Sequence, residues 1–212
     1  MQPIYRECST FEEIMMKIQT GDITKLREVD IIVNAANGIG VMGAGVAGAI
    51  SRSAGDLWSS NLRQYCKDNG PFEPGNCYSN GDAGLLKRRD IQEVYHAVTM
   101  KYPGGPTKME YVIDSVHQCI KRAISEGKKS IAFPGLGTGI GGLDKEAVAH
   151  RMATELMNYT DKIDILIIDR NQDFINHFKK ATGQDDKIEG NENHENITDT
   201  SYKRDNSAIS ET

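Results

Sequence analysis

Two glycine clusters contain the backbone groups of this sequence that could bind a phosphate. The first runs from residue 38 to 50 as GIGVMGAGVAGAI, and the second runs from 135 to 142 as GLGTGIGG. Glycine has no Cβ, so a glycine-rich turn that enters a helix can aim several N–H groups at one anion. One such turn holds one phosphate, and two of them predict a groove for a ligand with two phosphates.

Three polar residues near these clusters could contact the rest of such a ligand. Asp22 lies in the turn-like segment GDIT, where its carboxylate could accept a hydrogen bond from a base amine or cap the following turn. Asn34 and Asn37 lie at the end of an apolar run. Because an amide offers both a donor and an acceptor, each could cap the strand end or bind the hydroxyls of a sugar.

The elements that must position these residues alternate between strand and helix patterns. Strands are expected at residues 12–19, 29–35, 93–99, 130–133 and 163–168. Helices are expected at residues 43–62, from a capping box at Thr107 and Glu110 to Gly127, from an N-cap at Asp144 to about Tyr159, and around Phe174 and Phe178. Residues 71–84 are rich in turn formers and are expected to be loop. This alternation predicts an α/β fold with a mostly parallel central sheet, whose ligands bind beyond the carboxyl ends of the strands.

The charge of the chain is concentrated in its last segment. The 212 residues carry a formal net charge of −5, and residues 182–212 contain eight acidic and three basic residues. Residues 1–181 are therefore neutral, which does not favour a nucleic-acid surface. The last segment has too few apolar residues to bury a core. We expect one domain over residues 1–181, followed by a disordered acidic tail at 182–212.

Cysteine spacing and hydropathy indicate neither a metal site, nor a membrane span, nor a secreted protein. Cys8, Cys66, Cys77 and Cys119 form neither a CxxC pair nor a metal-ligand pattern. No apolar run approaches the roughly 18–20 residues of a membrane span, and the first residues lack the pattern of a secretory signal. We therefore expect a cytoplasmic monomer with reduced thiols, without a metal, a cofactor or a membrane partner.

Three short segments, taken together, resemble the macrodomain family of ADP-ribose-binding modules. They are GDIT at 21–24, VNAAN at 33–37 running into the first glycine cluster, and PGLGTGIGG at 134–142. The resemblance covers residues 12 to about 180 and implies a three-layer α/β/α sandwich with a mixed, mostly parallel sheet. It assigns Asp22 to the adenine, the glycine clusters to the pyrophosphate, and Asn37 to the distal ribose, with Asn34 supporting the loop. The implied ADP-ribose-binding residues are Gly21, Asp22, Ile23, Asn34, Ala35, Asn37, Val41, Met42, Gly43, Ala44, Gly45, Val46, Pro134, Gly135, Leu136, Gly137, Thr138, Gly139 and Ile140.

The catalytic residues of related hydrolases are missing. The sequence is similar to the terminal ADP-ribose glycohydrolase subgroup, but Met100 stands where that subgroup places its lysine, and Gly141 stands where it places its aspartate. Lys101 is one position late and, by strand alternation, should face away. Antitoxin relatives place a lysine at Ala44, and another hydrolase subgroup places an aspartate at Ala47. A lysine-adduct mechanism is therefore not predicted.

Asn37 remains as the predicted catalytic residue. The resemblance implies that Asn37, the glycine clusters and a bound water can hydrolyse the C1'' substituent of ADP-ribose 1''-phosphate or of a mono-ADP-ribosylated substrate. Two alternatives stay open. The first is a reader that binds ADP-ribose or ADP-ribosylated protein without turnover. The second is a nicotinamide-dependent oxidoreductase, because residues 38–43 match GxGxxG, although no strand ending in an acid follows about twenty residues later.

Three further side chains each have two interpretations. Asp144 fits a helix N-cap better than a catalytic acid. His96, within an expected strand, fits a packed histidine better than a general base. Arg170 could stack its guanidinium on adenine or be a solvated surface residue.

Overall fold

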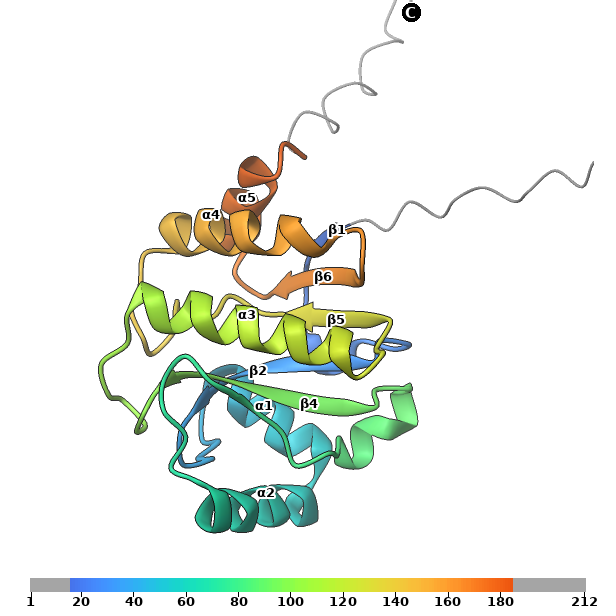
Figure 1. The fold of residues 1–212 in the computed structure, drawn as a ribbon, viewed down its shortest axis with the longest axis vertical. Helices are drawn as coiled ribbons and strands as arrows, with labels where there is room; N and C mark the ends of the chain where they lie inside the picture. Colours follow the sequence, from blue (N-terminus) through green and yellow to red (C-terminus); the bar gives the residue numbers. More distant parts are fainter. Residues whose placement is uncertain (1–15, 185–212) are drawn as a thin grey trace, which may run out of the picture.

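A computed structural model describes residues 16–184, which form one mixed six-stranded sheet (Figure 1). The strands, in chain order, are β1 (Met16–Thr20), β2 (Ile31–Asn37), β3 (Cys77–Tyr78), β4 (Glu93–Met100), β5 (Ser130–Phe133) and β6 (Asp164–Asp169). Their order in the sheet is β1-β6-β5-β2-β4-β3. Every neighbouring pair is parallel except β3 and β4, which are antiparallel. The expected α/β fold with a mostly parallel sheet is confirmed.

Helices cover both faces of this sheet. The α-helices are α1 (Gly45–Ala54), α2 (Asp56–Asn69), α3 (Met109–Ser125), α4 (Lys145–Leu156) and α5 (Gln172–Ala181). Short 3₁₀ helices are η1 (Ile23–Lys25), η2 (Gly84–Arg89) and η3 (Met157–Tyr159). Figure 1 shows α3, α4 and α5 over one face and α1 and α2 under the other, which is the expected three-layer arrangement.

Two hydrophobic cores follow from this layering, one on each face of the sheet. Along β2, Ile31 and Val33 face the core under α3, α4 and α5, whereas Ile32 faces the core over α1 and α2. Successive side chains of a strand point to opposite faces, and here both faces are covered. This explains why β2 reads as a continuous apolar run.

The structure corrects three expectations about local structure. The helix expected at 43–62 is two helices, because Gly55, with φ 98°, ends α1 and precedes α2. The loop expected at 71–84 contains the short edge strand β3. The capping box at Thr107 does not form, because Lys108 is the N-cap of α3 and the Thr107 hydroxyl donates to Thr99 O at the end of β4.

Two further expectations are confirmed within the described residues, the helix N-cap at Asp144 and the free thiols. Asp144 is the N-cap of α4, and its Oδ1 accepts from Ala147 N at 2.8 Å. Cys66, Cys77 and Cys119 are free thiols, while Cys8 lies outside the described residues. The first part of the strand expected at 12–19 and all but three residues of the predicted tail also lie outside them. Within residues 16–184, no helix has the length and apolarity that crossing a bilayer requires.

Candidate functional site

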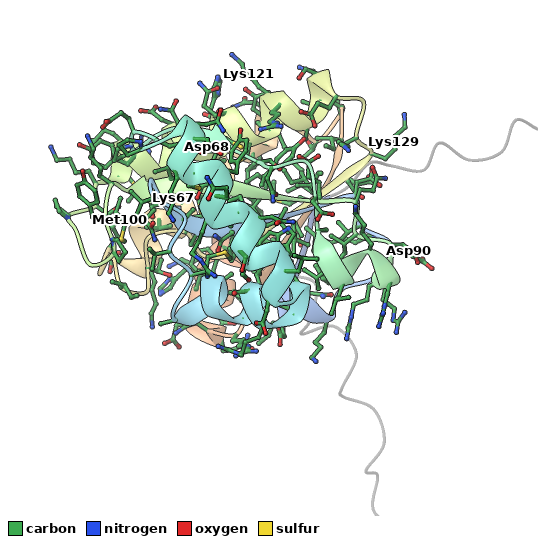
Figure 2. All side chains as sticks on the ribbon, turned by 90° about the horizontal axis from the view of Figure 1, so that it is seen from below. Lys67, Asp68, Asp90, Met100, Lys121 and Lys129 are labelled. Carbon is green, nitrogen blue, oxygen red and sulfur yellow. The ribbon has the colours of Figure 1, made fainter. Side chains whose placement is uncertain are left out.

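A cavity of about 400 Å³ lies at the carboxyl ends of the central parallel strands. Its lining comes from the ends of β2, β4 and β6, from both glycine clusters, and from the loop after β4. Figure 2 shows Met100, the last residue of β4, at the opposite end of the molecule from Asp90 and Lys129, which precede β4 and β5. The cavity therefore occupies the end of the sheet where ligands of open α/β folds bind.

The first glycine cluster presents the N-terminus of α1 to this cavity. Ala44 is the N-cap without a side-chain hydrogen bond, and Gly48 N is the donor that bonds back to Ala44 O, at 2.9 Å. The N–H groups of residues 45–47 precede that bond and have no partner within the helix. Together with the helix dipole they favour an anion at this point.

Only part of the first glycine cluster faces open space. A Cβ added to Gly43 or Gly45 would meet no atom within 4 Å, and both residues line the cavity. By contrast, a Cβ on Gly38 would lie 2.0 Å from Phe72 O. The cluster therefore combines a glycine required for close packing with glycines that open the site.

Asn37 is placed by an irregularity in the sheet. The pairing of β2 with β4 passes from Ala36 opposite Val98 to Asn37 opposite Met100, so Thr99 is the extra residue of a bulge. A bulge bends its strand and redirects the side chains beside it. Asn37, which is buried and lines the cavity, is the β2 residue at this irregularity.

The amide of Asn37 holds the turn that begins the first glycine cluster. Its Nδ2 donates to Val41 O at 2.7 Å, and its Oδ1 accepts from Val41 N at 3.1 Å and from Ile39 N at 3.3 Å. An amide nitrogen has two hydrogens, so one remains for a ligand. The amide expected to orient a sugar therefore also shapes the loop.

The second glycine cluster is held by Asp169, the last residue of β6. Asp169 Oδ2 accepts from Gly135 N at 2.9 Å, and Oδ1 accepts from Asn171 N at 2.8 Å. The hydroxyl of Thr138 donates to Gly135 O at 2.9 Å. That hydroxyl, expected to reach a phosphate, is thus used within the loop.

Open and packed glycines also alternate in the second cluster. A Cβ on Gly139 would meet nothing within 4 Å, and Gly139 lines the cavity opposite the first cluster. A Cβ on Gly141 would lie 2.6 Å from Gly137 O and 2.6 Å from Thr107 Cγ2. Gly141, where related hydrolases have an aspartate or an aromatic residue, is therefore filled by packing, not by a functional side chain.

Of the described residues that line the cavity, Lys145 alone carries a positive charge. Its Nζ lies 3.4 Å from Asp173 Oδ2 on α5, so the charge sits on the side of β6. On the side of β4 the lining consists of Thr99, Met100 and the loop residues Pro103 and Gly104. The neighbouring Lys101 does not line the cavity and pairs with Glu73 at 2.6 Å, as strand alternation predicts.

Asp22 lies just outside the lining of this cavity. Its Oδ1 accepts from Thr24 N at 3.0 Å, which caps η1, and its Oδ2 accepts from Arg170 at 2.6 Å. Burial opposes ionisation, but the hydrogen bonds from Arg170 and Thr24 outweigh it and hold the pKa of Asp22 below its ordinary value. Gly21 N donates to Asp169 O at 2.8 Å, which places this turn beside the second cluster.

Asn34 and His96 form a buried pair away from the cavity. Asn34 Nδ2 lies 3.1 Å from His96 Nδ1, and His96 stacks on Tyr78 with ring centroids 4.7 Å apart. Desolvation lowers the pKa of His96 to about 3, so the ring stays neutral at physiological pH. His96 is a packed histidine, as expected, and Asn34 is not at the mouth of the site.

The structure brings most of the predicted binding residues together. Those that line the cavity are Ala35, Asn37, Val41, Gly43, Ala44, Gly45, Val46, Gly135, Gly137, Thr138, Gly139 and Ile140. Those that do not are Gly21, Asp22, Ile23, Asn34, Met42, Pro134 and Leu136, of which Leu136 and Ile23 are in the cores. Lining residues not singled out as ligand contacts include Thr99, Pro103, Gly104, Lys145, Asp169 and Asn171.

No residue cluster suitable for a metal ion occurs within residues 16–184. The polar groups of the residues that line the cavity are main-chain N–H groups, the amides of Asn37 and Asn171, the hydroxyls of Thr99 and Thr138, one lysine and one carboxylate.

Sequence comparisons identify one family. A model described as Macro domain matches residues 33–152. An uncharacterised protein of Aquifex aeolicus is 32% identical over 170 residues, which are 79% of this chain and 98% of that protein. A protein of Cronobacter sakazakii named O-acetyl-ADP-ribose deacetylase is 36% identical over 135 residues, which are 63% of this chain and 72% of that protein.

Solved structures with the same fold carry the same family name. The macrodomain of Mycobacterium tuberculosis DarG superposes with a TM-score of 0.65 at 26% identity, covering 74% of this chain and 99% of that one. A Trypanosoma brucei macrodomain in complex with ADP-ribose superposes with a TM-score of 0.65 at 24% identity, covering 79% of this chain and 69% of that one.

Proposed function

The chain belongs to the macrodomain family, and we propose that it binds ADP-ribose in the cavity between its two glycine clusters. One observation carries this proposal. Open glycine positions of both clusters, Gly43 and Gly45 on one side and Gly139 on the other, face the same cavity. Main-chain N–H groups at such positions bind phosphates without the help of basic side chains.

The lining suggests how the ligand lies. The pyrophosphate would lie between the N-terminus of α1 and the second cluster. The adenosine would lie toward β6, where Lys145 and Asn171 line the cavity and Asp22 lies beside it. The distal ribose would then lie toward β4, over Asn37 and Met100.

We further propose that the protein hydrolyses a neutral acyl ester on the distal ribose. The β4 side of the cavity contains no positive charge, because Lys145 lies on the β6 side and Lys101 is turned toward Glu73. The free N–H groups of both clusters are assigned to the pyrophosphate, so the dianion of a 1''-phosphate would have no compensating charge on the β4 side, whereas an uncharged ester needs none. The relative named O-acetyl-ADP-ribose deacetylase supports the same substrate class.

The proposed chemistry relies on position and hydrogen bonds. The remaining Nδ2 hydrogen of Asn37 would bind the distal ribose or the ester oxygen, and a water held in the cavity would attack the acyl carbon. The bond between the acyl carbon and the ribose oxygen breaks, and the products are the carboxylate, a proton and ADP-ribose. ADP-ribose 1''-phosphate and mono-ADP-ribosylated proteins are the second candidates, since they carry the same distal ribose.

The test has two stages. Calorimetry with ADP-ribose should give saturable binding at micromolar concentrations, and no heat at millimolar ligand would refute the proposal. The protein is then incubated separately with O-acetyl-ADP-ribose, with ADP-ribose 1''-phosphate and with mono-ADP-ribosylated protein. We expect acetate release to be the fastest reaction and to be lost in Asn37→Ala. If no substrate turns over although ADP-ribose binds, the protein is a reader.

A further inference from the structure

We infer that Tyr78 is a positioning residue for the distal-ribose side of the cavity, because its hydroxyl donates a hydrogen bond to the main-chain carbonyl of Asn37. Tyr78 does not line the cavity and comes from β3, the edge strand on the far side of β4. The inference rests on the proposed function for its ligand, but its structural part concerns the free protein.

The hydrogen bond from Tyr78 is made to Asn37, the first residue of the turn that leads into the first glycine cluster. The hydroxyl donates to Asn37 O at 3.1 Å, and the same carbonyl accepts from Gly40 N at 3.4 Å to close the turn. Asn37 thus has its carbonyl held by Tyr78 and its amide held by Val41. Because the strand pairing shifts at this residue, these bonds set its orientation where the regular ladder does not.

The buried environment of Tyr78 keeps its hydroxyl protonated, so that it can act as a hydrogen-bond donor. The residue is 2% exposed, and its ring stacks on Phe72 at 4.2 Å and on the neutral His96 at 4.7 Å between centroids. Burial, with Cys66 and Cys77 nearby, raises the pKa of Tyr78 far above its ordinary value. The hydroxyl therefore keeps its hydrogen at neutral pH and can donate it to the Asn37 carbonyl.

The stack also connects Tyr78 to the underside of the first glycine cluster. Phe72 N donates to Gly38 O at 2.8 Å, and a Cβ on Gly40 would lie 2.6 Å from Cys66 Sγ. The turn thus rests directly on the residues that pack around Tyr78. Removing this hydroxyl leaves the rings in place, frees the Asn37 carbonyl and ends the contact of the hydroxyl with Cys66.

The test compares Tyr78→Phe with Tyr65→Phe. Tyr65 stacks on Phe72, as Tyr78 does, and on Tyr78 itself, with ring centroids 6.0 Å and 6.5 Å apart, and serves as the matched control. Each variant is titrated with ADP-ribose and with ADP, which lacks the distal ribose. We expect Tyr78→Phe to weaken ADP-ribose binding about three- to tenfold, the effect of one lost hydrogen bond, and ADP binding less than twofold. Equal losses for the two ligands, or no loss for ADP-ribose, would overturn the inference.

A second measurement needs no ligand. Hydrogen exchange of the N–H groups of Ile39, Gly40 and Val41 should be faster in Tyr78→Phe than in Tyr65→Phe at matched thermal stability. Unchanged exchange would overturn the inference, whether or not the wild-type protein binds ADP-ribose. Failure of the wild-type protein to bind ADP-ribose would instead count against the proposed function.

Discussion

The two glycine clusters face one cavity but are held in place by different chemistry. The first is anchored from inside the fold by uncharged groups, the Asn37 amide and the Tyr78 hydroxyl. The second is anchored at the edge of β6 by the carboxylate of Asp169, which accepts from Gly135 N and Asn171 N. Two loops can therefore present main-chain N–H groups to one cavity although different side chains hold them in place.

The difference has a physical consequence for each cluster. Neutral hydrogen bonds in a buried setting contribute little net free energy but define geometry, whereas hydrogen bonds to a charged acceptor are roughly twice as strong. We therefore expect the first cluster to depend on shape and the second on charge.

The largest effect should come from filling the open positions of both clusters. Gly43→Val and Gly139→Val add side chains where no protein atom lies within 4 Å. Each should weaken ADP-ribose binding by about two orders of magnitude, because two hydrogen bonds to a charged group are lost, while leaving thermal stability nearly unchanged. Calorimetry and thermal unfolding measure the two quantities.

The matched controls use the packed glycines. Gly38→Ala and Gly141→Ala would place a Cβ 2.0 Å and 2.6 Å from main-chain oxygens, so stability should fall instead. If Gly139→Val binds ADP-ribose as well as the wild type does, the second cluster does not contact the ligand and the comparison fails.

A smaller effect should follow from removing the charge that anchors the second cluster. In Asp169→Asn one of the two acceptors becomes a donor that faces an N–H group. We expect the free energy of unfolding to fall by about 1.5–3 kcal/mol in urea denaturation. Asp173→Asn, on an exposed side chain, is the control and should change it by less than about 0.5 kcal/mol. Equal values for the two variants would show that charge does not anchor this cluster.

The smallest effect concerns pH and the turn beside Asp169. The pKa of Asp22 is lowered in the folded protein. Ionised Asp22 therefore stabilises the fold at pH values above its pKa in the unfolded chain, which is near 3.8. That stabilisation is lost as the pH falls through the folded pKa. The difference in unfolding free energy between the wild type and Asp22→Asn should therefore be constant from pH 5 to 8 and shrink below about pH 4. A difference that grows in acid would contradict this assignment of Asp22.

Much of the fold could be predicted because the signals are local. The apolar run before Asn37 and the helical spacing along α3 determine element type without knowledge of the partners. The split at Gly55 was missed because a helix pattern continues on both sides of it. The strand β3 was missed because two residues among turn formers carry no period.

The candidate site could be predicted in its glycines but not in its supports. Asp169 was missed as a lining residue because its contact with Gly135 joins segments distant in sequence. Lys145 follows the second cluster by three residues, but a lysine in the first turn of a helix has no pattern that marks it as a lining residue. The bulge at Thr99 has no sequence signature, yet it decides where Asn37 lies. The capping box at Thr107 was predicted wrongly because the Thr107 hydroxyl bonds to the carbonyl of Thr99 in β4 and not to the N-terminus of α3.

The single supernumerary residue in β4 makes the site sensitive to chain length as well as to composition. With Thr99 deleted, β2 and β4 would continue in uninterrupted register: Asn37 would still pair with Met100, but the side chain of Met100 would move to the face of β4 that Thr99 now occupies. A one-residue deletion would thus exchange the side chains that line the β4 side of the cavity while the sheet stayed intact.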